Sequence, residues 1–160
     1  MVLAVNTEQK NVGMGEIAVA QAPVILAAVL GSCVGVAAYC PRLRLGGLAH
    51  VVLPRANGLV TNPGKFADTA VPHLLALMER KGALRNELVI KVAGGACMFG
   101  KGGPLQIGDD NAEVVLAVLQ REGLRLAGQD LGGTQGRRVS LDCATGTLHI
   151  DCVGMPRKTL

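Results

Sequence analysis

The stretch that decides the fold is residues 31–54, GSCVGVAAYCPRLRLGGLAHVVLP. It contains two apolar runs, 33–39 and 45–53, in which small and β-branched residues favour buried strands. The five residues between the runs, 40–44, include a proline and have the length of a β-hairpin connection. We therefore expect two neighbouring antiparallel strands in this part of the chain.

The register of this hairpin determines how Cys33 and His50 meet. A turn centred on residues 41–42 places Cys33 directly opposite His50, whereas a turn centred on residues 42–43 makes them diagonal neighbours. Either register places both side chains on one face of the sheet, with Cβ atoms roughly 5 to 8 Å apart. A thiol and an imidazole at this separation can act as a nucleophile and its base.

The surroundings of Cys33 leave two interpretations open. The turn at Gly31 and Ser32 leaves backbone N–H groups free, and such groups can lower the pKa of a thiol and hold an oxyanion. Cys33 is also explained as a small buried apolar residue, because free cysteine is among the most buried residue types. The other histidines, His73 and His149, are typical of surface or core-edge positions in a helix and a strand.

The composition limits the class of protein. Of the 160 residues, 49% are hydrophobic and 18% are charged, which predicts one folded domain over residues 1–160. Because only three residues are Trp, Tyr or Phe, the core must be built from aliphatic side chains. The net charge of +4 comes from scattered basic residues with almost no aromatic neighbours, so we expect no nucleic-acid partner.

The rest of the chain alternates short apolar runs with turn signals, which predicts a mixed α/β fold. The first helix is expected from Ala67 to Met78, with Pro72 inside it. The second helix is expected to begin at Asp110 and to end at Gly123. Asp110 is expected to be its N-cap, and Glu113, three residues later, completes a capping-box pattern. Strands are expected at 16–20, 24–29, 33–39, 45–53, 88–93, 124–129, 137–142 and 147–152.

Two features bear on the location of the protein. Residues 21–41 carry no charge and would pass for a membrane helix, but Pro23 and several β-branched residues favour two buried strands. The five cysteines form no CxxC pair and no zinc-ligand spacing, and the N-terminus lacks the features of a signal peptide. We expect free thiols in reducing cytoplasm, with no metal site and no membrane insertion.

A phosphate-binding loop is the main competing motif, because residues 95–101, GACMFGK, follow an apolar strand with the required spacing. Position 102 is glycine rather than the serine or threonine that binds magnesium. Gly103 and Pro104 follow where a helix should present its N-terminus to phosphate. We therefore expect neither a nucleotide site nor another cofactor.

An ordered set of short blocks resembles the CheD family of chemoreceptor glutamine deamidases, from about residue 13 to residue 150. Each block alone is weakly specific, whereas the ordered set is specific. The blocks are GSCVGV at 31–36, GLAHVVLP at 47–54, KFADTAV at 65–71, KVAGGACMF at 91–99, IG at 107–108 and DLGG at 130–133.

The resemblance implies a fold like that of deamidating bacterial toxins, with packed mixed or antiparallel sheets flanked by helices. It implies that Cys33 attacks the side-chain amide of a receptor glutamine, that His50 is its base, and that water then releases glutamate. The implied partners are the cytoplasmic helices of chemotaxis receptors and a CheC-type phosphatase. A receptor methylesterase side activity is also implied for some members.

One departure from the family pattern concerns the residue that orients the histidine. The family carries a threonine six residues before the cysteine, where this chain has Ala27. A backbone carbonyl or the Ser32 hydroxyl is then needed to hold the imidazole. If neither does, Ala27→Thr should raise the rate of deamidation, and the alternative is a catalytically weak adaptor that binds receptor or phosphatase.

Met98 and Phe99 lie in the glycine-rich segment 94–103 and are expected to contact a partner or substrate. Phe99 is predicted either to anchor a partner helix beside Cys33 or to fold back onto the core.

Overall fold

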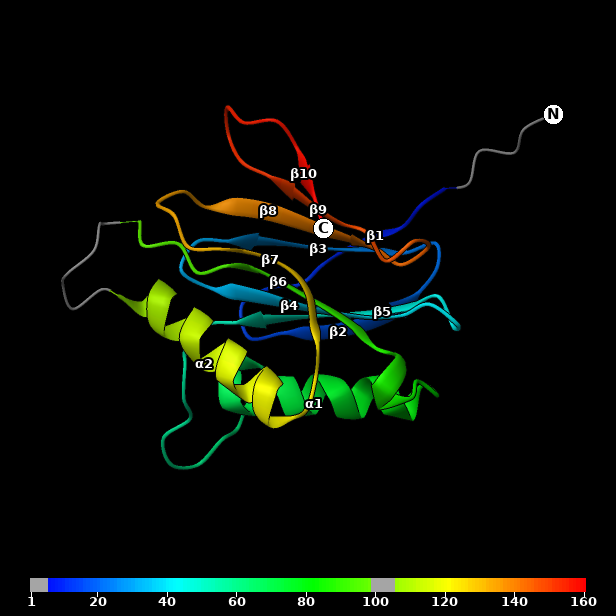
Figure 1. Ribbon diagram of the computed structural model, residues 1–160, viewed down its shortest axis with the longest axis horizontal. Coiled ribbons are helices and arrows are strands. Elements are labelled where there is room, and N and C mark those ends of the chain that lie inside the picture. Colours follow the sequence, from blue (N-terminus) through cyan, green and yellow to red (C-terminus); the bar gives the residue numbers. More distant parts are fainter. Residues whose placement is uncertain (1–5, 99–105) are drawn as a thin grey trace.

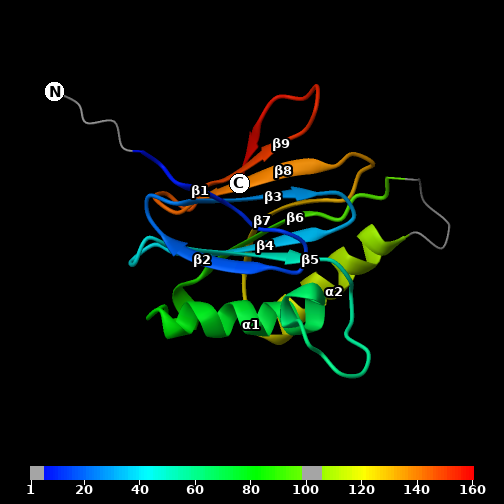
Figure 2. The same cartoon turned by 180° about the vertical axis from the view of Figure 1, so that it is seen from behind.

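Two β-sheets lie face to face, and two helices cover the outer face of one of them (Figures 1 and 2). The computed structural model describes residues 6–98 and 106–160. Sheet A contains, in spatial order, β1 (Gln9–Asn11), β3 (Ile25–Leu30), β8 (Arg137–Asp142), β9 (Leu148–Asp151) and β10 (Lys158–Thr159). Sheet B contains β2 (Ile17–Gln21), β5 (Leu45–Val51), β4 (Val34–Cys40), β6 (Val89–Gly94) and β7 (Leu126–Leu131). The helices are α1 (Ala67–Arg80) and α2 (Ile107–Arg121), and short 3₁₀ turns lie at Pro63–Lys65 and Arg85–Glu87.

Both sheets are mixed. β1 pairs with β3 in parallel, and β6 pairs with β7 in parallel. The other neighbouring strands are antiparallel. The expected fold class, mixed α and β with packed sheets and flanking helices, is confirmed.

Sheet B is covered on both faces, which explains its apolar central strands. One core, which includes Val36 and Val115, lies between sheet B and the helices, and a second, which includes Leu48 and Leu141, lies between the two sheets. Every residue of β4 and β5 is buried. Strands with both faces covered read as continuous apolar runs. The uncharged segment 21–41 accordingly forms the sheet strands β3 and β4, as predicted.

Two adjacent glycines in β5 let both neighbouring layers approach this strand closely. A Cβ on Gly46 would lie 2.6 Å from Cys143 Sγ in sheet A, and a Cβ on Gly47 would lie 2.7 Å from Leu74 Cδ1 in α1. Successive residues of a strand point to opposite faces, so each glycine serves one layer.

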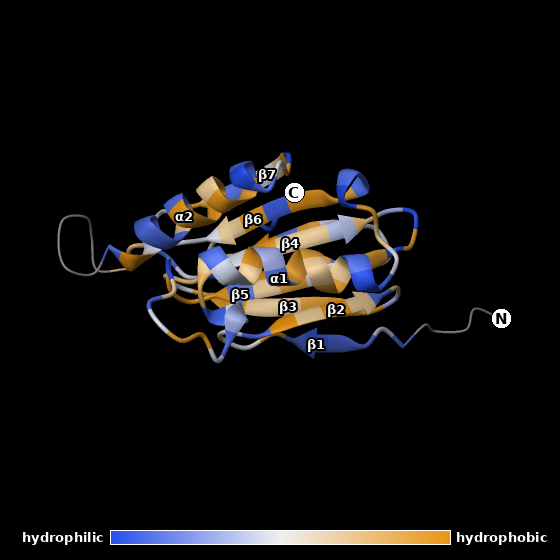
Figure 3. Ribbon diagram, turned by 90° about the horizontal axis from the view of Figure 1, so that it is seen from below, coloured by the Kyte–Doolittle hydropathy of each residue, from blue (hydrophilic) through white to orange (hydrophobic). Residues whose placement is uncertain are grey.

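The eight predicted strands are all present, with ends that differ by at most two residues. The strands β1 and β10 were not predicted, because three and two residues are too few to show periodicity. β1 forms an edge of sheet A and is hydrophilic along its length (Figure 3). The helices α1 and α2 lie across sheet B in the same view.

The predicted start of the second helix is wrong. α2 begins at Ile107, and Gln106 is its N-cap without a side-chain hydrogen bond. The N–H of Asp110 donates to the Gln106 carbonyl at 3.0 Å, so Asp110 already lies inside the first turn and cannot cap it. The earlier start is possible because Gly108 packs on backbone, where a Cβ would lie 2.7 Å from Gly95 O.

Within the described ranges 6–98 and 106–160, no helix has the length and apolar character that crossing a membrane requires.

Candidate active site

The hairpin of β4 and β5 brings Cys33 and His50 onto one face of sheet B. The ladder pairs Gly35 with His50 and Val34 with Val51, so Cys33 is the diagonal neighbour of His50. This is the second of the two predicted registers. Cys33 belongs to the core between the sheets and is 7% exposed. His50, which is 3% exposed, points to the same side as the core residue two positions before it in β5.

A backbone carbonyl holds the His50 imidazole. Nδ1 of His50 lies 2.9 Å from the carbonyl oxygen of Val12. A carbonyl can only accept, so Nδ1 carries the proton and donates it to this bond. In the neutral ring Nε2 then carries the lone pair, and it has no hydrogen-bond partner within the described residues. The imidazole is therefore oriented with its basic nitrogen unused.

The Cys33 thiol is buried in the core between the sheets. Burial raises the pKa of this thiol above its ordinary value. Desolvation of the thiolate sets this direction, although N–H groups of the preceding turn can act in the opposite direction. Among the described residues no hydrogen bond joins Cys33 to His50, and such bonds often tighten only when substrate is bound. The thiol needs a base to become a nucleophile.

The end of β6 supports the turn before the cysteine. The N–H of Gly95 donates to Cys33 O, and the N–H of Ala96 donates to Gly31 O, each at 2.9 Å. Gly94 has φ +109°, and a Cβ there would collide with Cys33 O. The backbone N–H of Cys33 itself donates no hydrogen bond within 6–98 and 106–160. A free N–H beside the sulfur can hold an oxyanion.

Met98 lies over the Gly31 turn, and its side chain is 54% exposed. A Cβ on Gly31 would lie 3.0 Å from Met98 Sδ, so the glycine leaves room for this contact. Phe99 lies outside the described residues, as does Lys101 of the rejected phosphate-loop motif.

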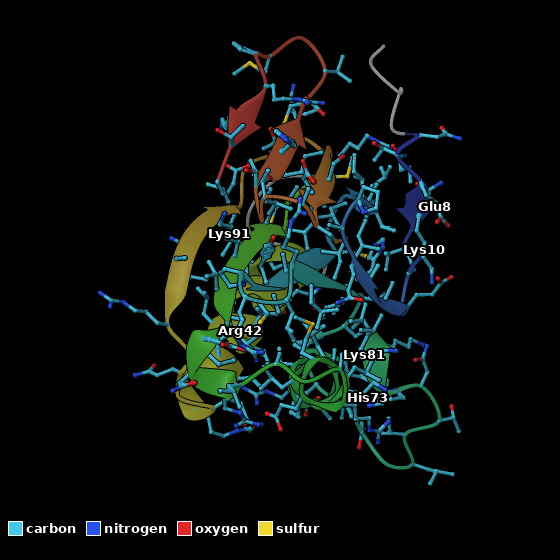
Figure 4. The ribbon with its side chains drawn as sticks, turned by 90° about the vertical axis from the view of Figure 1, so that its right-hand side faces the viewer. Glu8, Lys10, Arg42, His73, Lys81 and Lys91 are labelled. Carbon is cyan, nitrogen blue, oxygen red and sulfur yellow. The ribbon has the colours of Figure 1, made fainter. Side chains whose placement is uncertain are left out.

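Two histidines, His73 and His149, and two thiols, Cys40 and Cys143, have other surroundings. His73 is on α1, in the helical layer (Figure 4), and His149 is on β9. Cys40 donates to Glu87 Oε1 at 3.0 Å. Burial raises the pKa of Cys143 to about 11.

Asn111 is a site residue that sequence reasoning missed. Its Nδ2 donates to the carbonyls of Ser32 and Val52, at 3.0 and 2.9 Å, from a side chain with no exposed surface. The available signal was an amide on the apolar face of α2, three and four residues before Val114 and Val115.

A family model and several named relatives match this chain. A family model described as "CheD chemotactic sensory transduction" matches residues 52–152. A protein of Archaeoglobus fulgidus named "probable chemoreceptor glutamine deamidase CheD" is 47% identical over 130 residues, which covers 80% of this chain and 83% of the relative. Proteins with the same name from Methanococcus maripaludis and Desulforamulus reducens are 42% and 39% identical, over 88% and 100% of this chain and 92% and 100% of their own lengths. The chain belongs to the CheD family.

The Val12 peptide lies between His50 and Ala27, the position at which this chain departs from the CheD pattern. Ala27 is buried in β3, and its carbonyl accepts from the Val12 N–H at 2.7 Å. The carbonyl of the same Val12 residue accepts from His50. The backbone carbonyl anticipated as a substitute for the missing threonine is therefore present beside the position of that threonine.

We expect Ala27→Thr to leave kcat within about threefold of the wild-type value, because Val12 already orients the imidazole. Deamidation kinetics on a receptor fragment, at temperatures well below the melting point of each protein, measure this. A tenfold or larger gain in kcat would show that the Val12 carbonyl holds the ring poorly.

Proposed function

We propose that this chain is a chemoreceptor glutamine deamidase that uses Cys33 as nucleophile and His50 as base. The observation that carries the proposal is the orientation of the His50 ring, whose Nδ1 is bound to the Val12 carbonyl. Its Nε2 has no hydrogen-bond partner among residues 6–98 and 106–160, and the ring lies on the Cys33 side of the sheet. The names of relatives that align with most of the chain support the substrate class. The family-model match begins at Val52, so the choice of Cys33 and His50 rests on the hairpin.

The reaction has two halves. His50 Nε2 takes the Cys33 proton, and the thiolate attacks the side-chain amide carbon of a glutamine, with the Cys33 N–H available to the oxyanion. The imidazolium then protonates the amide nitrogen, the carbon–nitrogen bond breaks, and ammonia departs while the acyl group remains on Cys33 as a thioester. His50 next activates water, which hydrolyses the thioester to glutamate and restores the thiol. The sum is glutamine plus water giving glutamate plus ammonia.

We propose that the substrates are glutamines on the cytoplasmic helices of chemotaxis receptors and that the enzyme acts in the cytoplasm. We further propose that residues 1–160 form one domain. We propose a CheC-type phosphatase as a second binding partner. The same acyl-enzyme would also form from a glutamyl methyl ester, with methanol as the leaving group, so receptor methylesterase activity is a side reaction of the proposed site.

The direct test is incubation of the protein with a receptor cytoplasmic fragment and measurement of intact and peptide masses. Each glutamine converted to glutamate adds about one dalton, and the gain should grow with time and enzyme concentration. Binding of the fragment without any mass gain would instead identify the catalytically weak adaptor.

The raised pKa of Cys33 makes a separate prediction about pH. The thiolate fraction of a thiol rises as pH passes through its pKa, so alkylation of Cys33 by iodoacetamide should reach half its maximal rate at a higher pH than alkylation of free cysteine. At every pH below 10, Cys33 should still react faster than Cys143, whose pKa is about 11. Peptide mapping after timed labelling measures both rates. A midpoint at or below that of free cysteine would contradict the desolvated resting thiol.

A further inference from the structure

Asn111 occupies a position where an aliphatic side chain would be expected. It lies on the face of α2 that packs on sheet B, and no part of it is exposed. Its amide nitrogen makes two hydrogen bonds, but its Oδ1 is buried without a partner within the described residues. An unpartnered buried polar atom reduces stability, which an aliphatic residue at this position would avoid. The advantage of an amide over an aliphatic side chain must therefore come from its hydrogen bonds to two backbone carbonyls.

The two carbonyls held by Asn111 flank the candidate catalytic pair. Ser32 immediately precedes Cys33, and Val52 follows His50 by two residues. The ladder between β4 and β5 ends with the pairing of Val34 and Val51.

Beyond that pair the β5 segment turns away, because the N–H groups of Val52 and Leu53 donate to the Lys65 carbonyl at 2.9 and 3.0 Å. The Asn111 amide connects the segment before β4 to the segment after β5, where the β4–β5 ladder has ended. It therefore fixes their separation next to the nucleophile and the base.

The same contact also acts on the electronic state of the nucleophile's backbone. The Ser32 carbonyl and the Cys33 N–H belong to one peptide group. A hydrogen bond donated to the carbonyl polarises this group and makes its N–H a stronger donor. The Cys33 N–H has no acceptor within the described part of the chain, so the strengthened donor is free for a thiolate or an oxyanion.

We propose that Asn111 is a positioning residue for the Cys33 nucleophile, through its amide bonds to the Ser32 and Val52 carbonyls. The inference rests on the proposed function where it concerns deamidation and on the geometry alone where it concerns the reactivity of the thiol. Asn111 does not touch the reacting atoms and acts through the Ser32–Cys33 peptide and the β5 segment.

The decisive variant is Asn111→Leu, which keeps the number and branching of the side-chain heavy atoms and removes both donors together with the buried Oδ1. We expect its kcat on a receptor fragment to fall about 10²-fold, with KM within about threefold, because positioning affects the transition state more than substrate binding. Its melting temperature should fall, because the Ser32 and Val52 carbonyls lose their donor, so the rates are measured well below the melting temperature of each protein. Alkylation of Cys33 should become at least about threefold slower at pH 8, while alkylation of the partly exposed Cys152 stays unchanged.

Val115→Ala is the matched structural control. Val115 lies one turn further along the same helix and is fully buried against sheet B, but it makes no hydrogen bond to the Cys33 turn. This variant should lower the melting temperature and leave both kcat and the Cys33 alkylation rate at wild-type values well below that temperature. An equal loss of kcat in the two variants would make the effect of Asn111 a general loss of stability and overturn the proposal.

Asn111→Ser provides a second variant if the leucine protein does not fold, since its hydroxyl is too short to bind both carbonyls. Wild-type kcat together with wild-type Cys33 alkylation in either folded variant would overturn the proposal. If the wild-type protein itself converts no glutamine, the proposed function fails, and the alkylation rates still decide whether Asn111 controls the thiol.

Discussion

Replacement of Cys33 by alanine is expected to abolish deamidation, with a loss of at least about 10⁴-fold in kcat/KM. The thiolate forms the covalent bond to the amide carbon, and alanine has no atom that can form this bond. The fold should be retained, because the change removes a single sulfur atom from a residue at the edge of the inter-sheet core. Mass gain on a receptor fragment and thermal unfolding of the variant measure the two effects.

Cys143→Ala is the control for this variant. Cys143 is a fully buried thiol of the same inter-sheet core, so its replacement is the same chemical change. It lies against Gly46 near the start of β5, whereas His50 lies near the end of that strand. We expect this variant to lose stability, because it leaves a small cavity beside Gly46, and to keep its kcat. Residual activity above about 1% of wild type in the Cys33 variant would mean that the covalent mechanism is wrong.

The two strands of the central hairpin could be predicted because the residues that specify them lie within the strands and their connection. Small and β-branched residues on both faces specify strands buried on both sides. The register could not be decided in the same way. It depends on Arg44, which has φ +48° and donates from its N–H to Pro41 O at 3.2 Å, so the loop closes on the pair of Cys40 and Leu45. A left-handed arginine is uncommon and carries no signal in the sequence.

The groups that complete the site could not be predicted because they are backbone atoms from distant segments. The Val12 carbonyl follows the three-residue edge strand β1, and any residue could supply it. The Ser32 and Val52 carbonyls have no residue signature either. Asn111 is the exception, because an amide within an apolar helical stripe is visible in the sequence. The prediction of an N-cap at Asp110 failed for a different reason. The local sequence pattern of a cap was present, but the packing of Gly108 against distant backbone allowed the helix to start earlier.

Replacement of His50 by glutamine is the second change with a large expected effect. We expect kcat to fall about 10³-fold with little change in KM, because the same nitrogen takes the thiol proton, protonates the leaving ammonia and activates water. Glutamine keeps an N–H that can still donate to the Val12 carbonyl, so the contact is retained while the base is lost. The residual rate should rise steadily with pH, since hydroxide then has to deprotonate a thiol whose pKa is already raised by burial.

His149→Gln is the control for His50. His149 also has a buried ring nitrogen without a partner within the described residues, but it lies on β9 in sheet A. Its replacement should leave kcat and the pH profile unchanged. If His50→Gln retained more than about a tenth of the wild-type kcat, proton transfer would have to be assigned to another group, since loss of a general base is expected to exceed that factor. An oriented imidazole contributes to catalysis only if it transfers the proton of the thiol. Without that transfer, the hydrogen bond between His50 and Val12 would have a structural role, which is to hold β5 against the segment after β1.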